Sequence, residues 1–309
     1  MVSLVITTYN EENSIEKLLQ DILNQTLLPN ELIVVDAGSW DQTCHILNSY
    51  KDVFRKKSVN MMILSKTGAN IAQGRNIGIA AATGPVIAVT DAGCRLAATW
   101  LETLVKPISE GVAELVGGFY LPLISTRFHR ALAAVITAPQ PPKGFLPSSR
   151  SVAFLKSLWE KVGGYSEWLP WGEDTQFNLD CLRSGARYVV AKEALVYWNM
   201  RSNLKEVAKQ YFRYAYGDGM AFRLSRSYFV IQVVCWGSLT GSFIWGPQCL
   251  IPVMLYPFAK LLYRQVVFRP VIKFADLPIA FLIALTIELS HFAGFIWGIL
   301  FRCGRHDGT

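Results

Sequence analysis

The feature that most constrains this chain is the distribution of charge in its last third. From Tyr228 to Ala259 there is no Asp, Glu, Lys or Arg, and Leu277 to Phe301 contains one charged residue, Glu288. A helix of about twenty mainly apolar residues is long enough to cross a bilayer. We therefore expect residues 227–309 to form an α-helical transmembrane region.

The number of helices in this region is open, at two or three. The first apolar segment, about 228–263, is too long for one untilted span, and Gly246-Pro247 lies near its middle. It is either one long tilted helix or a hairpin of two short ones. The second segment, about 277–301, fits one span. Glu288 should face another helix, water or substrate, because a carboxylate at the bilayer centre costs about 2.5–3.5 kcal/mol on insertion scales.

Composition agrees with a membrane protein. Only 17% of the residues are charged and the net charge is +7, whereas soluble domains carry about a quarter of charged residues. Four cations between the apolar segments suit an anionic cytoplasmic leaflet better than nucleic acid. They are Lys260, Arg264, Arg269 and Lys273. The six cysteines form no C-x-x-C pair, which favours a reducing compartment, and the first residues carry no secretory-signal pattern. We expect a multi-pass protein of the cell membrane, with residues 1–226 on the cytoplasmic face and no nucleic-acid partner.

Residues 1–226 alternate between strand-like and helix-like patterns. The strand-like runs are Ser3–Tyr9, Leu32–Asp36, Met61–Ser65, Val86–Thr90 and Glu114–Tyr120. The amphipathic stretches between them are Ser14–Asn24, Gln42–Tyr50, Ile71–Ala82 and Trp100–Ile108. Alternation at this spacing favours βαβ units, so we expect an α/β fold with a mostly parallel sheet and helices on both faces.

Acidic residues follow three of these strands. Glu11 comes just after the first strand, Asp36 ends the second and Asp91 follows the fourth. Ligands of such sheets bind outside the carboxyl ends of the strands, so these side chains should share one edge. Carboxylates there can accept hydrogen bonds from a ribose or base, or hold a hard cation beside a diphosphate. The alternative is that Asp36 and Asp91 are turn or capping residues.

Four segments in this region resemble the family 2 glycosyltransferases. They are Val5–Glu12 (Val-Ile-Thr-Thr-Tyr-Asn-Glu-Glu), Ile33–Ser39, Gly74–Gly78 and Asp91–Gly93. The resemblance covers roughly residues 1–220 and implies a Rossmann-like GT-A fold, a nucleotide-diphosphate sugar as donor, and inversion at the anomeric centre. The donor-binding residues that it implies are Thr7, Tyr9, Glu11, Asp36, Arg75 and Asp91. A solvated helix face is the alternative for Arg75.

The family's D-x-D metal motif has a variant form here, Asp91-Ala92-Gly93-Cys94, as in a membrane-anchored subset of the family. With its second carboxylate missing, Asp91 is the one expected protein ligand. Mg²⁺ or Mn²⁺ would complete its shell with diphosphate oxygens and waters, which Mg²⁺ tolerates.

The acceptor side of the family pattern resembles Trp171-Gly172-Glu173-Asp174. By this resemblance Asp174 is the general base that deprotonates the acceptor hydroxyl, with Glu173 beside it as a catalytic residue. In-line attack with inversion needs a carboxylate on the face opposite the leaving diphosphate. The alternative is that both acids only favour a helix N-terminus through the dipole.

A last motif lies near the apolar region. Gln210-Tyr211-Phe212-Arg213-Tyr214 resembles the Q-x-x-R-W motif of processive members, with Tyr214 in place of Trp. Arg213 would give positive charge to the departing diphosphate, and Gln210 and Tyr214 would contact the donor or acceptor. The alternative is an interfacial helix over 204–224 at the headgroup level. We place this helix in the catalytic domain, residues 1–226.

The function expected from these features is a membrane-bound inverting glycosyltransferase that acts on a hydroxyl of a lipid, a lipid-linked glycan or another membrane-apposed acceptor. Two alternatives are a non-catalytic membrane scaffold with a degenerate transferase domain and a nucleotidyltransferase on a similar sheet. For Ser148-Ser149-Arg150, which follows a proline-rich stretch, one interpretation is a position near the acceptor or donor sugar; we favour the other, a plain connecting loop.

Overall fold

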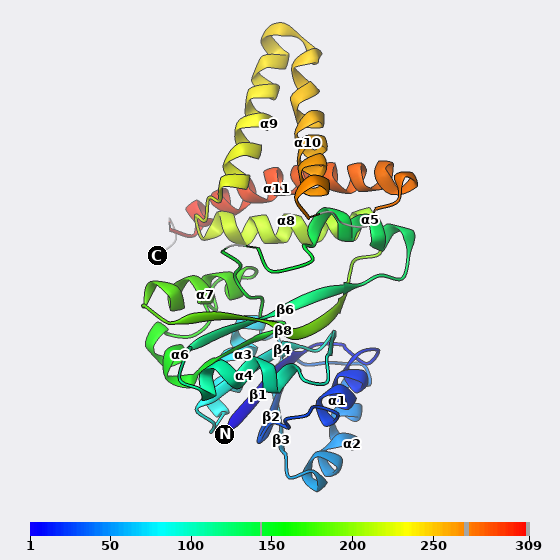
Figure 1. The fold of residues 1–309 in the computed structure, drawn as a ribbon. Helices are drawn as coiled ribbons and strands as arrows, with labels where there is room; N and C mark the ends of the chain where they lie inside the picture. Colours follow the sequence, from blue (N-terminus) through cyan, green and yellow to red (C-terminus); the bar gives the residue numbers. More distant parts are fainter. Residues whose placement is uncertain (143, 269–271, 307–309) are drawn as a thin grey trace. The chain divides into compact units, whose positions relative to one another are not determined.

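The computed structural model describes residues 1–142, 144–268 and 272–306. The chain divides into two compact units. The first holds residues 1–121 and 140–199, and the second holds residues 122–139 and 200–309. Figure 1 shows the elements of both.

The first unit begins with four parallel strands. β1 (Val2–Thr8), β2 (Glu31–Asp36), β3 (Asn60–Ser65) and β4 (Val86–Asp91) lie in the order β3-β2-β1-β4. The helices α1 (Ile15–Leu23), α2 (Thr43–Lys56) and α3 (Ile71–Ala81) connect them. β1 and β2 are rich in Val, Ile and Leu and almost wholly buried, as central parallel strands are.

β1 sets the geometry at the carboxyl edge of this sheet. Thr8 pairs with Asp36 on one side, and Thr7 pairs with Asp91 on the other. Neighbouring strands lie about 4.8 Å apart, so the Cα atoms of Asp36 and Asp91 are separated by about 10 Å. Asp36 and Asp91 therefore lie at almost the same height along the strand direction, one on each side of β1.

The rest of the sheet corrects the expectation of a mostly parallel arrangement. β5 (Cys94–Leu96), β6 (Leu115–Leu123), β7 (Val152–Leu155) and β8 (Tyr188–Asn199) complete eight strands in the order β3-β2-β1-β4-β7-β6-β8-β5. β7 is antiparallel to β4 and β6, and β5 is antiparallel to β8. The sheet is therefore mixed. Hydrophobic patterning shows where a strand occurs but not the direction in which it enters the sheet, because both ladders bury the same kind of residue.

Helix α3 packs closely on this sheet. A Cβ atom on Gly78 would lie 2.6 Å from Val5 Cγ1, and one on Gly74 would lie 2.8 Å from Thr7 Cγ2. The helix starts with a capping box in which Asn70 and Gln73 each bond the other's backbone. α3 is thus fixed against β1, one turn from the carboxyl edge.

Three further helices complete the unit. They are α4 (Trp100–Ser109), α6 (Lys156–Val162) and α7 (Glu173–Arg183). α7 packs into the core through Phe177, whose ring lies 5.0 Å from that of Phe154 and is stacked 4.3 Å from that of Tyr165. These contacts fix the first turn of α7, where Glu173 and Asp174 lie.

The second unit is helical. Its elements are α5 (Arg127–Ile136), α8 (Leu204–Met220), α9 (Arg226–Trp245), the 3₁₀ turn η1 (Pro247–Leu250), α10 (Ile251–Phe268), the 3₁₀ turn η2 (Phe274–Asp276) and α11 (Leu277–His306). α9 and α10 form a hairpin (Figure 1). The chain turns at Gly246, whose φ of +100° favours glycine, before Pro247. Of the two arrangements expected for 228–263, the structure has the hairpin.

The domain boundary expected at residue 226 differs from this division. α8 packs along α11, so it belongs to the second unit together with α5. Glu288 is buried and accepts a 2.5 Å hydrogen bond from Lys260 of α10, so it faces another helix. Two stretches, Tyr228–Trp245 and Phe274–Arg302, are long and apolar enough to cross a membrane, judged by length and composition. Of the four expected cations, Arg269 lies outside the described residues.

Candidate active site

Asp36 closes the turn that follows β2. Its Oδ2 accepts hydrogen bonds from the backbone N–H groups of Gly38 and Ser39, both at 2.9 Å, and its Oδ1 accepts one from Ser39 Oγ at 2.5 Å. The side chain is buried. Asp36 thus has the turn role that was the alternative interpretation, and donor binding by Asp36 stays a prediction.

The loop after β1 is tied to the loop after β2. Asn10, in the left-handed region at φ +54°, donates from its backbone N–H to Ser39 Oγ (2.8 Å) and accepts from the N–H of Trp40 (3.1 Å). Glu11 donates from its N–H to Thr43 Oγ1 at 2.8 Å. The two loops are therefore ordered together at the carboxyl edge.

Two aromatic side chains are exposed on these loops. Tyr9 is 55% exposed and Trp40 is 80% exposed. Such rings offer stacking faces for a base or a sugar. Tyr9 was predicted to contact the donor, whereas Trp40 was not singled out, because a lone Trp in a loop carries no pattern. The Thr7 methyl group packs beneath the backbone of Gly74, so α3 covers this side chain.

Arg75 joins the two halves of the predicted site. Its Nη2 donates to Asp91 Oδ1 at 2.9 Å, and its Nη1 donates to Glu173 Oε1 at 2.5 Å. The side chain of Arg75 is 2% exposed, that of Glu173 8% and that of Asp91 29%. Arg75 is therefore not on a solvated helix face. One buried guanidinium connects the end of β4 with the start of α7.

Burial and charge act together on this cluster. Burial alone would lower the pKa of Arg75, but the carboxylates of Asp91 and Glu173 raise it above its ordinary value. Burial raises the pKa of Glu173, an effect that Arg75 opposes and the neighbouring charge of Asp174 strengthens. Tyr165 lies 5.4 Å from the guanidinium, measured to its ring centre, and burial raises the pKa of its hydroxyl. Arg75 stays charged, and its charge holds both carboxylates in place.

Asp174 lies beside this bridge, in the first turn of α7. Its Oδ1 accepts from the N–H of Thr175 at 2.7 Å, and its Oδ2 accepts a long 3.4 Å bond from the N–H of Ser149. Ser149 is buried, with its Oγ 3.1 Å from the hydroxyl of Tyr165. The loop 148–150 thus contacts the predicted base directly.

Arg150 corrects the interpretation of that loop as a plain connector. Its Nε lies 3.8 Å from Asp91 Oδ2, and its guanidinium carbon lies 4.7 Å from the ring centre of Trp198 and 5.8 Å from that of Tyr120. Sequence reasoning noticed the segment but could not place it. The proline-rich stretch before it carries no periodicity, and its partner Trp198 lies 48 positions further along the chain.

The carboxylates near Asp91 limit how a metal ion could be held. The Glu11 carboxylate lies beside the loop after β4, with Oε2 3.8 Å from the position of a Cβ on Gly93. Among the described residues, no group of three or more His, Cys, Asp or Glu side chains could hold a metal ion. These side chains do not surround a metal ion with protein ligands on all sides. They fit Mg²⁺ or Mn²⁺ that takes one carboxylate oxygen and fills its shell with diphosphate oxygens and water.

The Gln210 motif lies on α8 in the second unit. Gln210 Nε2 donates to the hydroxyl of Tyr214 at 2.7 Å, and its Oε1 accepts from Arg201 Nε at 3.2 Å. The roles of Gln210, Arg213 and Tyr214 at the active site stay predictions.

The residues that the first unit does bring together can do two things. On one side, Asp91 and Arg150 can hold a diphosphate, the first through a divalent ion and the second directly. On the other, Asp174 offers a carboxylate oxygen with one weak partner, which can accept a proton. The Arg75 bridge fixes the spacing between these sides.

Comparison with known proteins identifies the family. The family model described as "Glycosyl transferase family 2" matches residues 3–192, and "Glycosyl transferase family group 2" matches residues 105–301. The glycosyltransferase EpsJ of Bacillus subtilis is 25% identical over 223 residues, which cover 67% of this chain and 63% of EpsJ. The glycosyltransferase AglE of Haloferax volcanii is 34% identical over 119 residues, which cover 38% of each chain.

A solved structure shares the fold. The mannosyltransferase PcManGT of Pyrobaculum calidifontis, solved with GDP-Man and Mn²⁺, aligns over 96% of this chain and 86% of its own, with a TM-score of 0.61 and 16% identity. The chain covers less than two thirds of the length of either curated relative above. The predicted α/β GT-A fold and family are confirmed, with the sheet mixed. Because the first family model matches more than half of its residues, this protein belongs to glycosyltransferase family 2.

Proposed function

We propose that this protein transfers a sugar from a nucleotide-diphosphate donor to a hydroxyl group, with inversion at the anomeric carbon. The observation that carries this proposal is the Arg75 bridge. It connects Asp91, at the edge where donors bind in such sheets, with Glu173, the direct neighbour of Asp174. The bridge therefore sets the separation between Asp91, where the leaving group would bind, and the start of α7, where Asp174 would accept the proton.

On the donor side, the diphosphate lies at the end of β4. Asp91 would hold Mg²⁺ or Mn²⁺, and such an ion would neutralise the charge that develops on the diphosphate. Arg150 adds a fixed positive charge next to Asp91. Tyr9 and Trp40 offer exposed rings for the nucleotide on the loops beyond β1 and β2. Glu11 and the Asp36 turn complete this edge.

On the acceptor side, Asp174 accepts the proton of the attacking hydroxyl. The oxygen attacks the anomeric carbon while the bond to the diphosphate breaks, and the electron pair of that bond leaves with the diphosphate. Holding the base and the leaving group at opposite sides of one site orients the attack, so the configuration inverts. Glu173 keeps its place through Arg75 and does not itself touch substrate.

The acceptor that we propose is a lipid, a lipid-linked glycan or another molecule at the membrane surface, with the catalytic unit on the cytoplasmic face. The α9–α10 hairpin, which carries no charged residue from Tyr228 to Ala259, supports membrane attachment, because helices that expose many apolar side chains are unstable in water. The basic residue Lys273 suits an anionic leaflet.

The test compares Asp174→Asn with a matched control, Asp180→Asn, on the same helix. Asp180 is bonded to Gln176 and Arg183 and stands outside the bridge. Release of nucleoside diphosphate from UDP-, GDP- and dTDP-sugars is measured with Mn²⁺ and a membrane lipid extract as acceptor. Asp174→Asn should lower the rate by about 10²–10⁴-fold, the usual contribution of a general base. Donor affinity and thermal stability should stay as in the wild type.

Two outcomes would contradict the proposal. Asp174→Asn could turn over donor at the wild-type rate, which would remove its role as the base. Alternatively, the wild type could release no nucleoside diphosphate from any donor and show no thermal shift with any of them, as a scaffold protein would.

A further inference from the structure

Helix α11 is long and apolar enough to be counted as a membrane span, and the sequence alone predicts that it crosses. We infer instead that α11 lies along the membrane surface, with its exposed stripe on the acyl chains of one leaflet, and that only the α9–α10 hairpin enters the bilayer. This inference rests on the membrane attachment proposed above and is independent of sugar transfer.

The first observation is that α11 is packed backbone to backbone against α8. A Cβ atom on Gly294 would lie 2.3 Å from the carbonyl oxygen of Phe212, and one on Gly298 would lie 2.2 Å from that of Tyr216. On the other helix, a Cβ on Gly219 would lie 2.3 Å from the carbonyl oxygen of Phe295. Small residues allow such close approach between helices. The order of these contacts shows that α8 and α11 run parallel. The second half of α11 must therefore lie at the same depth relative to the membrane as α8.

The second observation is that α8 is a charged helix. Its charged residues, spread from the first turn to the last, are Lys205, Glu206, Lys209, Arg213 and Asp218. Each charge placed at the bilayer centre costs about 2.5–3.5 kcal/mol on insertion scales, so a helix with several of them does not cross. Because α11 is packed on α8 over two turns, it does not cross either.

The third observation is that both ends of α11 are held by helices of the same unit. Before its first turn, Asp276 is 1% exposed and accepts hydrogen bonds from Arg127 Nε (2.7 Å) and Arg130 Nε (2.6 Å), both on α5. Near its other end, Arg302 donates to the carbonyl oxygen of Met220, the last residue of α8, at 2.8 Å. A spanning helix would have these two ends on opposite sides of the hydrocarbon. Here each end is bound by an arginine contact that suits the headgroup region.

The fourth observation is an apolar stripe on the free face of α11. Leu282, Leu289 and Leu300 are 46%, 43% and 59% exposed. Their spacings of seven and eleven residues place them on one side of the helix, away from Gly294 and Gly298. The stripe is about 27 Å long, from eighteen residues at 1.5 Å each. A helix with one apolar face and charged companions on the other lies in the plane of the interface.

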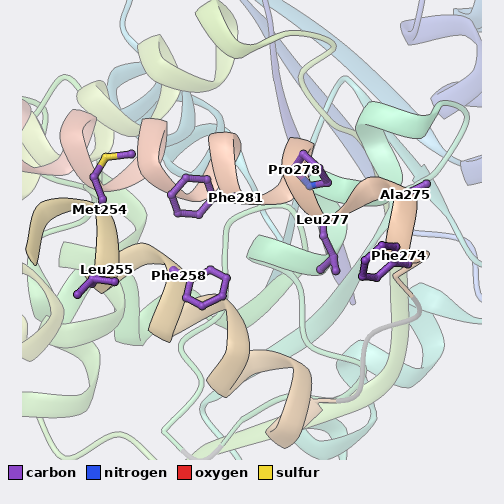
Figure 2. Close-up of a pocket in the computed structure, with 8 residues that line it drawn as sticks. All are labelled: Met254, Leu255, Phe258, Phe274, Ala275, Leu277, Pro278 and Phe281. Atoms are coloured by element: carbon purple, nitrogen blue, oxygen red, sulfur yellow. The ribbon is translucent and has the colours of Figure 1, made fainter. Parts of the chain in front are cut away.

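The α9–α10 hairpin differs from α11 in its direction. In Figure 1 it projects away from α8 and α11. At its tip, Phe243 is 89% exposed, Ile244 67% and Trp245 69%. α9 has twenty residues, about 30 Å, which matches the hydrocarbon thickness. Where α10 meets the start of α11, a groove of about 530 Å³ is lined only by apolar side chains, among them Met254, Phe258 and Phe281 (Figure 2). Acyl chains fit such a wall, whereas a soluble partner would be expected to meet a polar rim.

The experiment measures the depth of single sites in the full-length protein, bound to vesicles of phosphatidylcholine and phosphatidylglycerol. Cysteines replace Leu282, Leu289 and Leu300 in turn, in a background in which Cys44, Cys249 and Cys303 are replaced by Ser. Each carries a fluorophore that is quenched by nitroxide lipids of known depth. The same label is placed on Phe229→Cys and Phe243→Cys of α9, which serve as the control for a helix that enters the bilayer.

The three α11 sites should report one shared, shallow depth. The two α9 sites should differ by about 21 Å, the rise over fourteen residues. A spread of about 27 Å along α11, with Leu289 near the centre, would show that the helix crosses and overturn the inference. Quenching on α9 with none on α11 would show that another protein surface covers the stripe, which also overturns it.

Flotation of the same vesicles separates this inference from the proposed attachment. If the protein does not float with the vesicles, both the attachment and the inference fail. Sugar transfer is measured in parallel on the unlabelled parent. Transfer with a spanning α11 would leave the proposed catalysis standing and remove only the inference.

Discussion

The Arg75 bridge predicts that removing its cation will destabilise the first unit strongly. In Arg75→Met, a side chain of similar length fills the space, but Glu173 and Asp91 lose their shared partner. Glu173 is 8% exposed and was 2.5 Å from the guanidinium, so water cannot take the place of the lost charge. Breaking a buried pair in this way typically costs about 3–5 kcal/mol. At an effective dielectric constant of 20, one charge pair separated by 4 Å contributes about 4 kcal/mol, which agrees.

The assay is thermal unfolding of the detergent-solubilised protein, followed by tryptophan fluorescence. A loss of 3–5 kcal/mol lowers Tm by about 6–20 °C for a unit of this size. Arg55→Met is the matched control, because the side chain of Arg55 is 79% exposed and its pair with Asp52 contributes little. The double variant Arg75→Met with Glu173→Gln should recover part of the lost stability, since the buried carboxylate is then neutral.

The pH dependence has a definite sign. Burial raises the pKa of Glu173, and removal of Arg75 raises it further, because the opposing charge is gone. A carboxyl group with a raised folded-state pKa stabilises the fold below its unfolded-state pKa, and this stabilisation is lost as pH rises through the folded-state pKa. The deficit of Arg75→Met should therefore shrink at low pH and grow toward neutral pH. A Tm equal to the wild type at neutral pH, or no recovery in the double variant, would refute the reasoning.

Two other substitutions test separate parts of the structure. Arg150→Gln should raise the KM for donor by about 10- to 150-fold with little change in Tm, since a charge-assisted contact to phosphate is worth about 1.5–3 kcal/mol. An unchanged KM in initial-rate measurements would remove Arg150 from the donor site. Gly78→Val should lower the unfolding free energy by about 1–3 kcal/mol through overpacking, because its Cβ would meet Val5 Cγ1 at 2.6 Å and Val35 Cγ2 at 3.1 Å. Denaturant unfolding checks it, and full wild-type stability would mean that α3 does not pack so closely.

The parallel half of the sheet could be predicted from the sequence because each of its strands is a short apolar run followed by an amphipathic helix. The expected strand Leu32–Asp36 corresponds to β2 at Glu31–Asp36, and the expected helix Ile71–Ala82 to α3 at Ile71–Ala81. The expected strand Glu114–Tyr120 likewise corresponds to β6 at Leu115–Leu123, but β5, β7 and β8 were not predicted. β7 is four residues long, and β8 at Tyr188–Asn199 mixes charged and apolar residues without a clear period.

At the site, single motifs could be predicted but their connections could not. Asp91 and Asp174 stand in recognisable segments, and both lie at the Arg75 bridge. Arg75 itself was left between a donor contact and a solvated helix face, because its burial depends on α7, 98 positions away along the chain in the pairing with Glu173. The contacts of Arg150 could not be predicted for the same reason. Contacts between distant segments leave no local pattern.

The hydropathy of α11 predicts a membrane span, which our inference replaces with a helix at the membrane surface. Its residues are apolar enough to span, but its glycines record a close helix partner instead, and hydropathy alone does not distinguish lipid from protein as the apolar neighbour.

The most direct test of the central claim is the anomeric configuration of the product. With a donor identified by the nucleoside-diphosphate assay, the new glycosidic linkage is followed by proton NMR from the first turnover. An Asp174 base facing a diphosphate held at Asp91 predicts that an α-linked donor gives only the β-linked product. An α-linked product would contradict this arrangement, because retention requires attack from the side that the diphosphate leaves.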